Sequence, residues 1–335
     1  MCLTVYIQET INRAHYKVSL GKVAFVQPNI PATVKWDPAQ GPATLEILEK
    51  LTTQAAAMRP QLILWPEAST PWALRGDDNI RTWTESLVAK TRVPLLLGSL
   101  AIEQLNTPAE SWYNAAFVVD PISGTQPDYY AKQKLVPFGE YVPFRPLLGW
   151  LEKVVPVGSG DIAAGVLPRP LVTNLGAQPV ALGPLICYED IFPSLARDNV
   201  LAGADVLVVL TNNGWFGEGA AAYQHAAHSV LRAVETRRPV LRAGNAGWSG
   251  WIDEFGAVRS VATDAERGIY FRGVRAVEVT RDFRWIGRKS FYVEHGDWFV
   301  VVCAFLVAGA GFMIRFAPPP EEDPVPSTAS DAPVA

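Results

Sequence analysis

A cysteine in this sequence stands where a nucleophile would be placed. Cys187 follows an apolar run of strand character at residues 180–186 and precedes a predicted helix at residues 191–201. At such a strand-to-helix turn, the N–H groups of the helix N-terminus favour a thiolate, which is the form of cysteine that attacks a carbonyl carbon. The alternative is structural, because a single cysteine is commonly a small buried apolar residue.

A thiol that attacks a carbonyl also needs a base for its proton and a group that stabilises the oxyanion. Glu67 directly follows an apolar run at residues 62–65, and this setting is expected to raise the carboxyl pKa toward the range useful for a general base. Lys132 begins a loop in which Pro137 and Pro143 prevent regular structure, and its charge would lower the thiol pKa. Taken singly, Glu67 also fits a helix N-cap or a solvated acid, and Lys132 fits a surface lysine.

The segments that must position these residues alternate between strand and helix. Apolar and β-branched runs predict strands at residues 22–27, 62–65, 94–100, 180–186 and 205–210. Helical spacing predicts helices at residues 44–58, 80–90, 191–201 and 221–238. A hairpin within 113–132 and three short strands between 240 and 261 complete the prediction. The alternation predicts an α/β fold, and the candidate residues fall at strand ends, where such sheets place their sites.

Two of these segments give sharper expectations. Pro184 cannot donate a hydrogen bond to a neighbouring strand, so it argues against a central place in the sheet for residues 180–186. The predicted helix at residues 221–238 carries one stripe typical of an amphipathic helix, which consists of Tyr223, Ala227, Val230, Leu231 and Val234.

The composition argues against several kinds of partner. Hydrophobic residues make up 49% of the 335 residues, charged residues make up 19%, and the net charge is -4, so no nucleic-acid surface is indicated. Three cysteines are too few for a disulfide framework in a domain of this size. His225 and His228 are spaced i, i+3 on a predicted helix, but no third ligand accompanies them at a suitable spacing. A structural role is therefore favoured over a metal site.

Residues 298–314 form the last predicted element and carry no charge. At about 1.5 Å per residue this run would span about 26 Å as a helix, close to the ~30 Å hydrocarbon core, with Arg315 reaching the interface. Trp298 at one end and the acidic, proline-rich tail favour a membrane helix over a buried core helix. The tail itself is predicted to be disordered, and the first residues lack the pattern of a secretory signal peptide.

The order and local settings of Glu67, Lys132 and Cys187 resemble the carbon–nitrogen hydrolase (nitrilase) superfamily, whose triad is Glu, Lys and Cys. Longer motifs resemble one branch, the apolipoprotein N-acyltransferases. These motifs are VQPNI at 26–30, KWD at 35–37, LVPFGEYVPF at 135–144, ICYEDIFP at 186–193, LTNNGWFG at 210–217, QH at 224–225 and RAVETRRPVLRAGNAGWSGWID at 232–253. The resemblance extends over residues 21–316.

The resemblance implies a role for the residues at the matching positions. Glu67 is the implied general base, Lys132 stabilises the intermediate, and Cys187 carries the acyl group as a thioester. Three residues would support them, namely Glu140, Tyr188 and Glu189. Three aromatic residues would contact the substrate: Trp36 lines the lipid entrance, and Trp215 and Phe216 lie in an apolar loop that favours a lipid. No metal and no organic cofactor is implied.

The implied fold is α/β, a four-layer α-β-β-α sandwich, with residues 298–314 as the family's last membrane helix. The predicted organisation is an N-terminal extension at residues 1–20, a catalytic domain at 21–290, a transmembrane helix at 296–316 and a disordered tail at 317–335.

The implied activity is ping-pong acyl transfer. An acyl chain would move from a phospholipid ester to Cys187, and then to the α-amine of a diacylglyceryl-cysteine at the N-terminus of a lipoprotein. The partners would be phospholipid, lipoprotein and membrane. With water in place of the amine, the same triad would give an amidase that acts on a small amide. A catalytically silent binding module is a third hypothesis, against which the intact triad argues.

The location of the domain is left open by two conflicting indications. The family carries several membrane helices before a periplasmic catalytic domain at the inner membrane, whereas only residues 1–20 precede the domain predicted here. A shortened form, a misplaced start codon and a separate membrane subunit as partner therefore stay open. Under the positive-inside rule, four basic residues before the apolar run would instead keep the domain cytoplasmic: Arg281, Arg284, Arg288 and Lys289.

Overall fold

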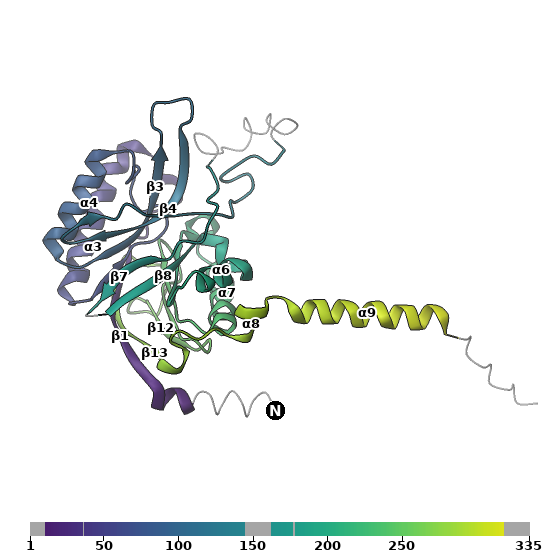
Figure 1. The fold of residues 1–335 in the computed structure, drawn as a ribbon. Coiled ribbons are helices and arrows are strands. Elements are labelled where there is room, and N and C mark those ends of the chain that lie inside the picture. The colour runs from purple at the N-terminus through teal and green to yellow at the C-terminus, as the bar shows by residue number, and fades with distance from the viewer. Residues whose placement is uncertain (1–10, 36, 145–161, 177, 318–335) are drawn as a thin grey trace, which may run out of the picture. The chain divides into compact units, whose positions relative to one another are not determined.

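The computed structural model describes residues 11–35, 37–144, 162–176 and 178–317 (Figure 1). The predictions for Trp36 and for the tail from residue 318 onward lie outside the described residues. The chain divides into two compact units, residues 1–296 and residues 297–335.

The first unit contains two mixed β-sheets. The first sheet has the strand order β13-β1-β2-β3-β4-β5, with β6 paired to β4. Its strands are β1 (Lys17–Gln27), β2 (Leu62–Leu64), β3 (Leu95–Glu103), β4 (Ser111–Asp120), β5 (Gly124–Thr125), β6 (Tyr130–Ala131) and β13 (Gly273–Asp282). The second sheet has the order β12-β11-β10-β9-β8-β7. Its strands are β7 (Leu171–Leu175), β8 (Gln178–Ile186), β9 (Val206–Thr211), β10 (Val240–Gly244), β11 (Gly250–Ile252) and β12 (Val258–Val261).

The central strands of each sheet run parallel, β1 to β3 in the first sheet and β8 to β10 in the second. The two sheets face one another across the main core. On β1, Val23 and Phe25 point into the core between the sheets, whereas Ala24 and Val26 point to the opposite face. Because successive side chains of a strand alternate between faces, a strand covered on both faces is apolar throughout. This double burial explains the uninterrupted apolar runs in the sequence.

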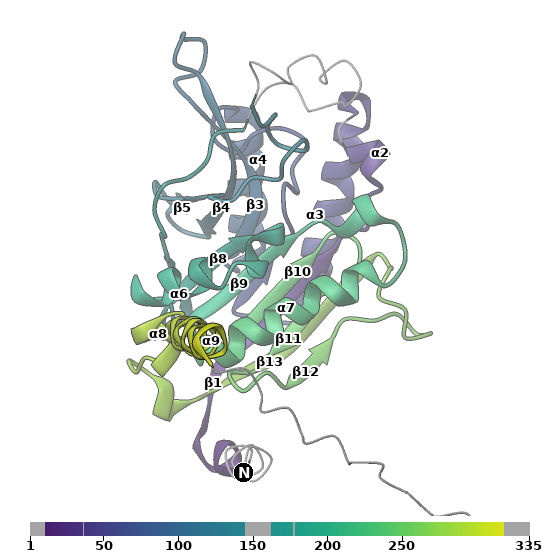
Figure 2. The same cartoon turned by 90° about the vertical axis from the view of Figure 1, so that its right-hand side faces the viewer.

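Helices cover the outer face of each sheet (Figures 1 and 2). Helices α3 (Gly41–Ala57) and α4 (Asp78–Thr91) pack on the first sheet, where Leu48 and Val88 are fully buried. Helices α6 (Pro193–Leu201) and α7 (Ala221–Thr236) pack on the second sheet together with the short helix α8 (Phe291–His295). The predicted four-layer α-β-β-α arrangement is thus confirmed.

Strands β7 and β13 have no counterpart in the sequence prediction. Each lies at an edge of its sheet. The side chains of β13 are mostly half-buried, and those of β7 alternate between buried and exposed, so neither strand carries a continuous apolar run. Strand β13 is held by its pairing to β1, a long-range interaction that no local pattern encodes, whereas β7 forms a hairpin with the neighbouring β8.

The expectation from Pro184 was wrong for the strand as a whole, since β8 is an internal strand between the edge strand β7 and β9. The reason is that β7 pairs only with β8 residues from Gln178 to Leu182, so β8 extends past this neighbour before it reaches Pro184. No donor is required there on the open side, and the Pro184 carbonyl accepts a hydrogen bond from the Asn199 side chain.

The stripe predicted on the helix that became α7 is not its buried face. Tyr223 and Leu231 are each 52% exposed, whereas a face of small and polar residues is buried: Ala222, Ala226, Ser229, Arg232, Ala233 and Thr236. Small side chains let the helix approach the sheet closely, Ser229 and Arg232 donate to Asp190 in the turn after β8, and Thr236 donates to the Arg232 carbonyl of its own helix. The helical period was therefore predicted correctly, and the face that it buries was not.

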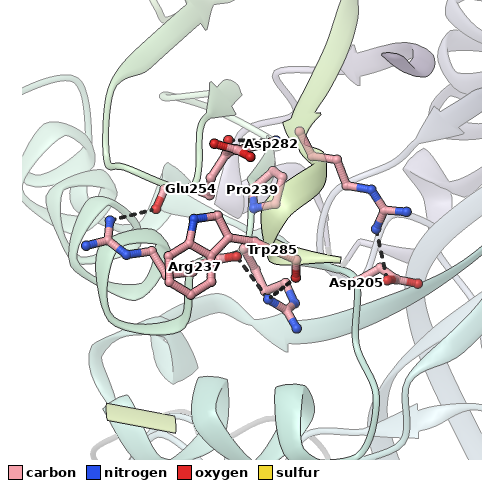
Figure 3. Close-up of a pocket in the computed structure, with 8 residues that line it drawn as sticks. Asp205, Arg237, Pro239, Glu254, Asp282 and Trp285 are labelled. Atoms are coloured by element: carbon pink, nitrogen blue, oxygen red, sulfur yellow. Dashed lines mark hydrogen bonds and ion pairs between the residues drawn. The ribbon is translucent and has the colours of Figure 1, made fainter. Parts of the chain in front are cut away.

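A polar cluster occupies the amino-terminal ends of β9 and β10 (Figure 3). It surrounds a cavity of about 10 Å³, the room of about one water molecule, lined by Asp205, Arg237, Arg238, Pro239, Glu254, Arg281, Asp282 and Trp285. Arg238 donates to the main-chain oxygens of Ala204 and Arg288 there, so the cluster links loops that precede these strands to the segment after β13. It lies at the opposite strand ends from Cys187.

The second unit contains the helix α9 (Trp298–Phe316). Among the described residues, it is the one helix that is long and apolar enough to cross a membrane, and none of its apolar window is buried by protein.

Candidate active site

Glu67 is placed by the end of β2. The chain leaves the sheet at Leu64, and the main chain of Glu67 then passes directly over Gly98 of β3. A Cβ at Gly98 would lie 2.7 Å from the Glu67 Cα, so only glycine permits this approach. The Glu67 side chain is buried, which excludes the solvated loop acid considered from the sequence.

Lys132 directly follows β6 and is 1% exposed, so it is not a surface lysine. Its Nζ lies 3.2 Å from Glu67 Oε1 and 2.9 Å from Glu140 Oε1. Its main chain is fixed on both sides, because its N–H donates to Asn114 O and its carbonyl accepts from Gly165 N, each at 2.8 Å. One ammonium thus joins the two carboxylates that the sequence singled out.

Asn114 on β4 connects the same two acids and was not identified from the sequence. Its Nδ2 donates to Glu67 Oε1 over 2.8 Å and to Glu140 Oε1 over 2.9 Å. The signal in the sequence was the single amide side chain, directly after Tyr113, among the apolar residues of β4. Asn114 keeps the two carboxylates close to one another and to Lys132.

The electrostatics of Glu67 differ from the sequence expectation. Burial alone would raise its pKa, but the ammonium groups of Lys132 and Lys35 outweigh burial and hold the pKa of Glu67 below its usual value. Burial likewise opposes the charge on Lys132, but Glu67, Cys187 and Glu140 outweigh it and raise the pKa of Lys132. The prediction of a raised Glu67 pKa was wrong because it considered the apolar neighbours without the cations.

Cys187 begins a 3-10 helix, η3 (Cys187–Ile191), directly after β8, and α6 follows only at Pro193. Its φ of 54° lies in the left-handed region, which a residue other than glycine adopts rarely and at a cost in conformational energy. The sharp turn is held by Glu189, whose carboxylate accepts from Ile186 N at 2.7 Å, Gln133 N at 2.6 Å and Lys134 N at 3.0 Å. Glu189 thereby joins the cysteine turn to the loop that carries Lys132.

Cys187 is half-buried as a residue, and its sulfur has polar neighbours. Thr211, the last residue of β9, donates its hydroxyl hydrogen to Sγ over 3.5 Å. Burial and the charge of Glu67 raise the pKa of the thiol to about 12, against the opposing effects of Lys132, Thr211 and the Asn212 N–H. The expectation that the helix N-terminus would favour the thiolate was therefore wrong for the resting site.

The remaining predicted residues take different positions. Tyr188 donates to Leu135 O over 2.6 Å, and its ring centroid lies 5.7 Å from Lys132 Nζ, so it lies between the turn and the lysine loop. Trp215 and Phe216 lie in the 3-10 helix η4 (Asn213–Phe216) after β9, and both are more than 60% exposed. No contact between them and the Glu67–Lys132 pair is present among the described residues.

A buried ionic network lies behind the cysteine turn. Asp190 accepts from Arg242 Nη1 and Ser229 Oγ, each at 2.6 Å, and lies 2.9 Å from His225 Nε2. His225 Nε2 is also 3.2 Å from the main-chain oxygen of Cys187. The motifs quoted from the sequence contain Asp190, His225 and Arg242, but they did not indicate that these residues contact one another. Among the described residues, no group of three His, Cys, Asp or Glu side chains is arranged to hold a metal.

The arrangement can perform nucleophilic acyl chemistry. The Glu67 carboxylate and the Lys132 ammonium form an ion pair, and both act electrostatically on the thiol of Cys187. The carboxylate can accept the thiol proton, and the ammonium can stabilise negative charge on a carbonyl oxygen.

This fold and site define a nitrilase-like α/β protein. An amidase from Nesterenkonia sp. has a similar fold, with a TM-score of 0.58 at 18% identity, over 84% of this chain and 97% of the amidase. That likeness concerns the fold alone. The carbon-nitrogen hydrolase family pattern matches residues 22–282, and the chain belongs to this family.

Two relatives, both named apolipoprotein N-acyltransferase, are more similar in sequence. The protein from Geobacter metallireducens is 36% identical over 297 residues, which cover 88% of this chain and 53% of the relative. The protein from Azotobacter vinelandii is 34% identical over 266 residues, which cover 79% of this chain and 50% of the relative. The chain thus spans about half the length of these relatives.

Proposed function

We propose that this chain carries the catalytic domain of an N-acyltransferase that uses Cys187 as a thioester-forming nucleophile. The observation that supports this most strongly is the buried contact of Lys132 with Glu67 and Glu140 beside the cysteine turn. The similarity of the chain to proteins named apolipoprotein N-acyltransferase favours an acyl donor and an amine acceptor over a small amide as substrates.

In the first half-reaction, Sγ of Cys187 attacks the ester carbonyl of a phospholipid. The thiol proton passes to the Glu67 carboxylate as the C–S bond forms, and Lys132 stabilises the oxyanion. The ester C–O bond then breaks, and the leaving lysophospholipid alkoxide takes the proton from Glu67. The product is a thioester on Cys187.

In the second half-reaction, the α-amine of a diacylglyceryl-cysteine attacks the thioester. Glu67 accepts a proton from the amine, the C–S bond breaks as the amide forms, and the thiolate of Cys187 takes that proton from Glu67. Exposed aromatic side chains support a lipid substrate, because they provide apolar contact area. Phe138 and Phe144 lie in the chain after Lys132, which follows β6, and Trp215 and Phe216 lie after Thr211, which ends β9. The membrane is the proposed location, since α9 has the length and apolarity of a span.

Acyl transfer from vesicles tests the proposal directly. The purified full chain is incubated with vesicles of dioleoyl phosphatidylethanolamine and phosphatidylglycerol, and the peptide that contains Cys187 is examined by mass spectrometry. We expect the mass gain of one oleoyl group, its absence in Cys187→Ala, and faster discharge by a diacylglyceryl peptide than by water. Faster discharge by water would favour the amidase, and no adduct on wild-type protein would contradict the acyltransferase.

A further inference from the structure

A second buried lysine approaches the same acid from another direction. Lys35 is the last residue of the short helix α2 (Ala32–Lys35), and its side chain is buried. Its Nζ donates a hydrogen bond to the main-chain oxygen of Glu67 over 2.8 Å. Lys132, by contrast, reaches the carboxylate of Glu67. The two lysines therefore hold Glu67 at different atoms.

The negative charges of the site exceed the single positive charge of Lys132, so a second cation would balance them. Lys132 is in contact with the carboxylates of both Glu67 and Glu140, so two negative charges face one ammonium. A thiolate on Cys187 would add another negative charge, and Glu67 already opposes it. An uncompensated charge in a buried site is costly. The ammonium of Lys35 balances the two carboxylates before the thiolate forms.

We propose that Lys35 is a positioning residue of the acyl-transfer site, whose ammonium supplies the second positive charge that allows Cys187 to ionise beside Glu67. The inference rests on the proposed function only in taking Cys187 as the nucleophile. It requires no particular acyl donor or acceptor.

The titration of Lys35 gives this role a pH signature. Burial lowers the pKa of Lys35 to about 8, and the titratable groups that face it, Glu67 and Cys187, limit the decrease. Lys35 is therefore mostly charged at pH 7 and loses its charge as the pH rises through 8. Below this pH the thiolate of Cys187 is stabilised by two lysines, and well above it by Lys132 alone.

Alkylation of Cys187 by iodoacetamide measures how the charge of Lys35 affects the ionisation of Cys187, without any lipid substrate. The thiolate sulfur forms a bond to the methylene carbon and iodide leaves, so the rate follows the thiolate fraction. The rate is measured between pH 6.5 and 9.5 on the full chain, by mass spectrometry of the Cys187 peptide, which separates it from Cys2 and Cys303. We expect the wild-type logarithmic profile to flatten near pH 8, where Lys35 loses its proton.

Two substitutions separate charge from packing. Lys35→Met removes the charge, and we expect its Cys187 to be alkylated about tenfold more slowly than that of wild type at pH 6.5. This factor corresponds to a rise of about one unit in the pKa of the Cys187 thiol. Near pH 9.5, where Lys35 of the wild type is neutral, we expect the two rates to approach one another. Lys35→Arg keeps a charge that does not titrate, so we expect the wild-type rate at pH 6.5 and no flattening near pH 8. Lys22→Met is the matched control, because Lys22 Nζ also donates to a main-chain oxygen, that of Met58, outside the site.

The outcomes distinguish this inference from the proposed function. If Lys35→Met slows alkylation by one factor at every pH while Lys35→Arg keeps the flattening, Lys35 has only a structural role and the inference is wrong. Should Lys35→Met fail to fold, the pH profile of Lys35→Arg still tests the inference, because the flattening near pH 8 must be absent if the charge of Lys35 is its cause. A protein that forms no oleoyl adduct yet shows both profile changes would contradict the acyltransferase and leave the role of Lys35 supported.

Discussion

Glu67 and Lys132 form a buried ion pair, with 3.2 Å between Oε1 and Nζ and less than one tenth of each side chain exposed. The pair keeps Glu67 ionised, whereas the thiol of Cys187, with a pKa raised to about 12, keeps its proton at pH 7. The resting site therefore holds a carboxylate and a thiol. Proton transfer must accompany the attack on the carbonyl, which makes Glu67 a base in the chemical step.

Glu67→Gln should remove the proton acceptor and leave the shape of the site nearly unchanged. We expect formation of the acyl adduct on Cys187 to slow by about 10²- to 10⁴-fold, the usual contribution of a general base. The rate is measured with the phospholipid vesicles described above, and thermal unfolding reports whether the variant folds. Glu46→Gln, an exposed position on α3, is the control and should keep the wild-type rate. A well-folded Glu67→Gln protein with the wild-type rate would exclude Glu67 as the base.

Much of this site could be predicted from the sequence, because its main residues follow strands with strong apolar patterns. Glu67 and Cys187 come directly after β2 and β8, and the parallel strand ends of the two sheets bring them together. The pKa directions of both residues could not be predicted, since that of Glu67 depends on the distant Lys132 and Lys35 and that of Cys187 depends on burial and on the distant Glu67. Asn114 was missed for a related reason: a polar residue within an apolar strand shows its role only when its partners are known.

Asn114→Asp should disrupt the contact between the two acids. The amide nitrogen that donates to Glu67 and Glu140 would be replaced by a carboxylate oxygen, which would face the carboxylates of these two residues without a hydrogen to donate. We expect the free energy of unfolding at pH 7 to fall by about 3–5 kcal/mol, as for other uncompensated buried charges, and acylation to be lost. Urea unfolding gives the first quantity.

Asn174→Asp on strand β7 is the control for Asn114→Asp, because Asn174 is exposed and the same change there should cost little. Equal stability losses in the two variants would show that the amide of Asn114 does not hold the acids together.

Glu189→Gln tests the link between the cysteine turn and the lysine loop. Both carboxylate oxygens of Glu189 accept hydrogen bonds, Oε1 from two main-chain N–H groups and Oε2 from Ile186 N and Tyr130 OH. A glutamine must turn its NH₂ toward one of these pairs of donors, which leaves Gln133 N and Lys134 N without an acceptor in one orientation and Ile186 N in the other, where Tyr130 OH can accept instead. At about 1–3 kcal/mol for each donor left without an acceptor, we expect a loss of roughly 1–6 kcal/mol in urea unfolding. Glu266→Gln, in an exposed turn, should be nearly neutral.

Asp190→Asn should have an effect that depends on pH. Burial opposes the charge of Asp190, but Arg242 and His225 outweigh burial and hold its pKa below the ordinary value of 3.8. A lowered pKa stabilises the fold above that ordinary value, and the stabilisation is lost as the pH falls through the folded pKa. We expect Asp190→Asn to lower the free energy of unfolding by about 3–5 kcal/mol at pH 7, and the difference from wild type to shrink at pH 3 and below. A difference that stays constant with pH would show that packing, and not charge, accounts for the loss.

The helix α9 leads to a prediction about membrane binding that is independent of the active site. Val307 lies at the middle of the helix and is exposed. Lysine at the centre of a spanning helix costs about 3 kcal/mol more than valine, so Val307→Lys should reduce partition of the full chain into vesicles by about 10²-fold. Val307→Leu is the size-changing control and should float with vesicles as wild type does. If Val307→Lys also floats at the wild-type level, α9 is not a spanning helix, and its apolar surface must be covered by protein, because so large an apolar surface is not stable in water.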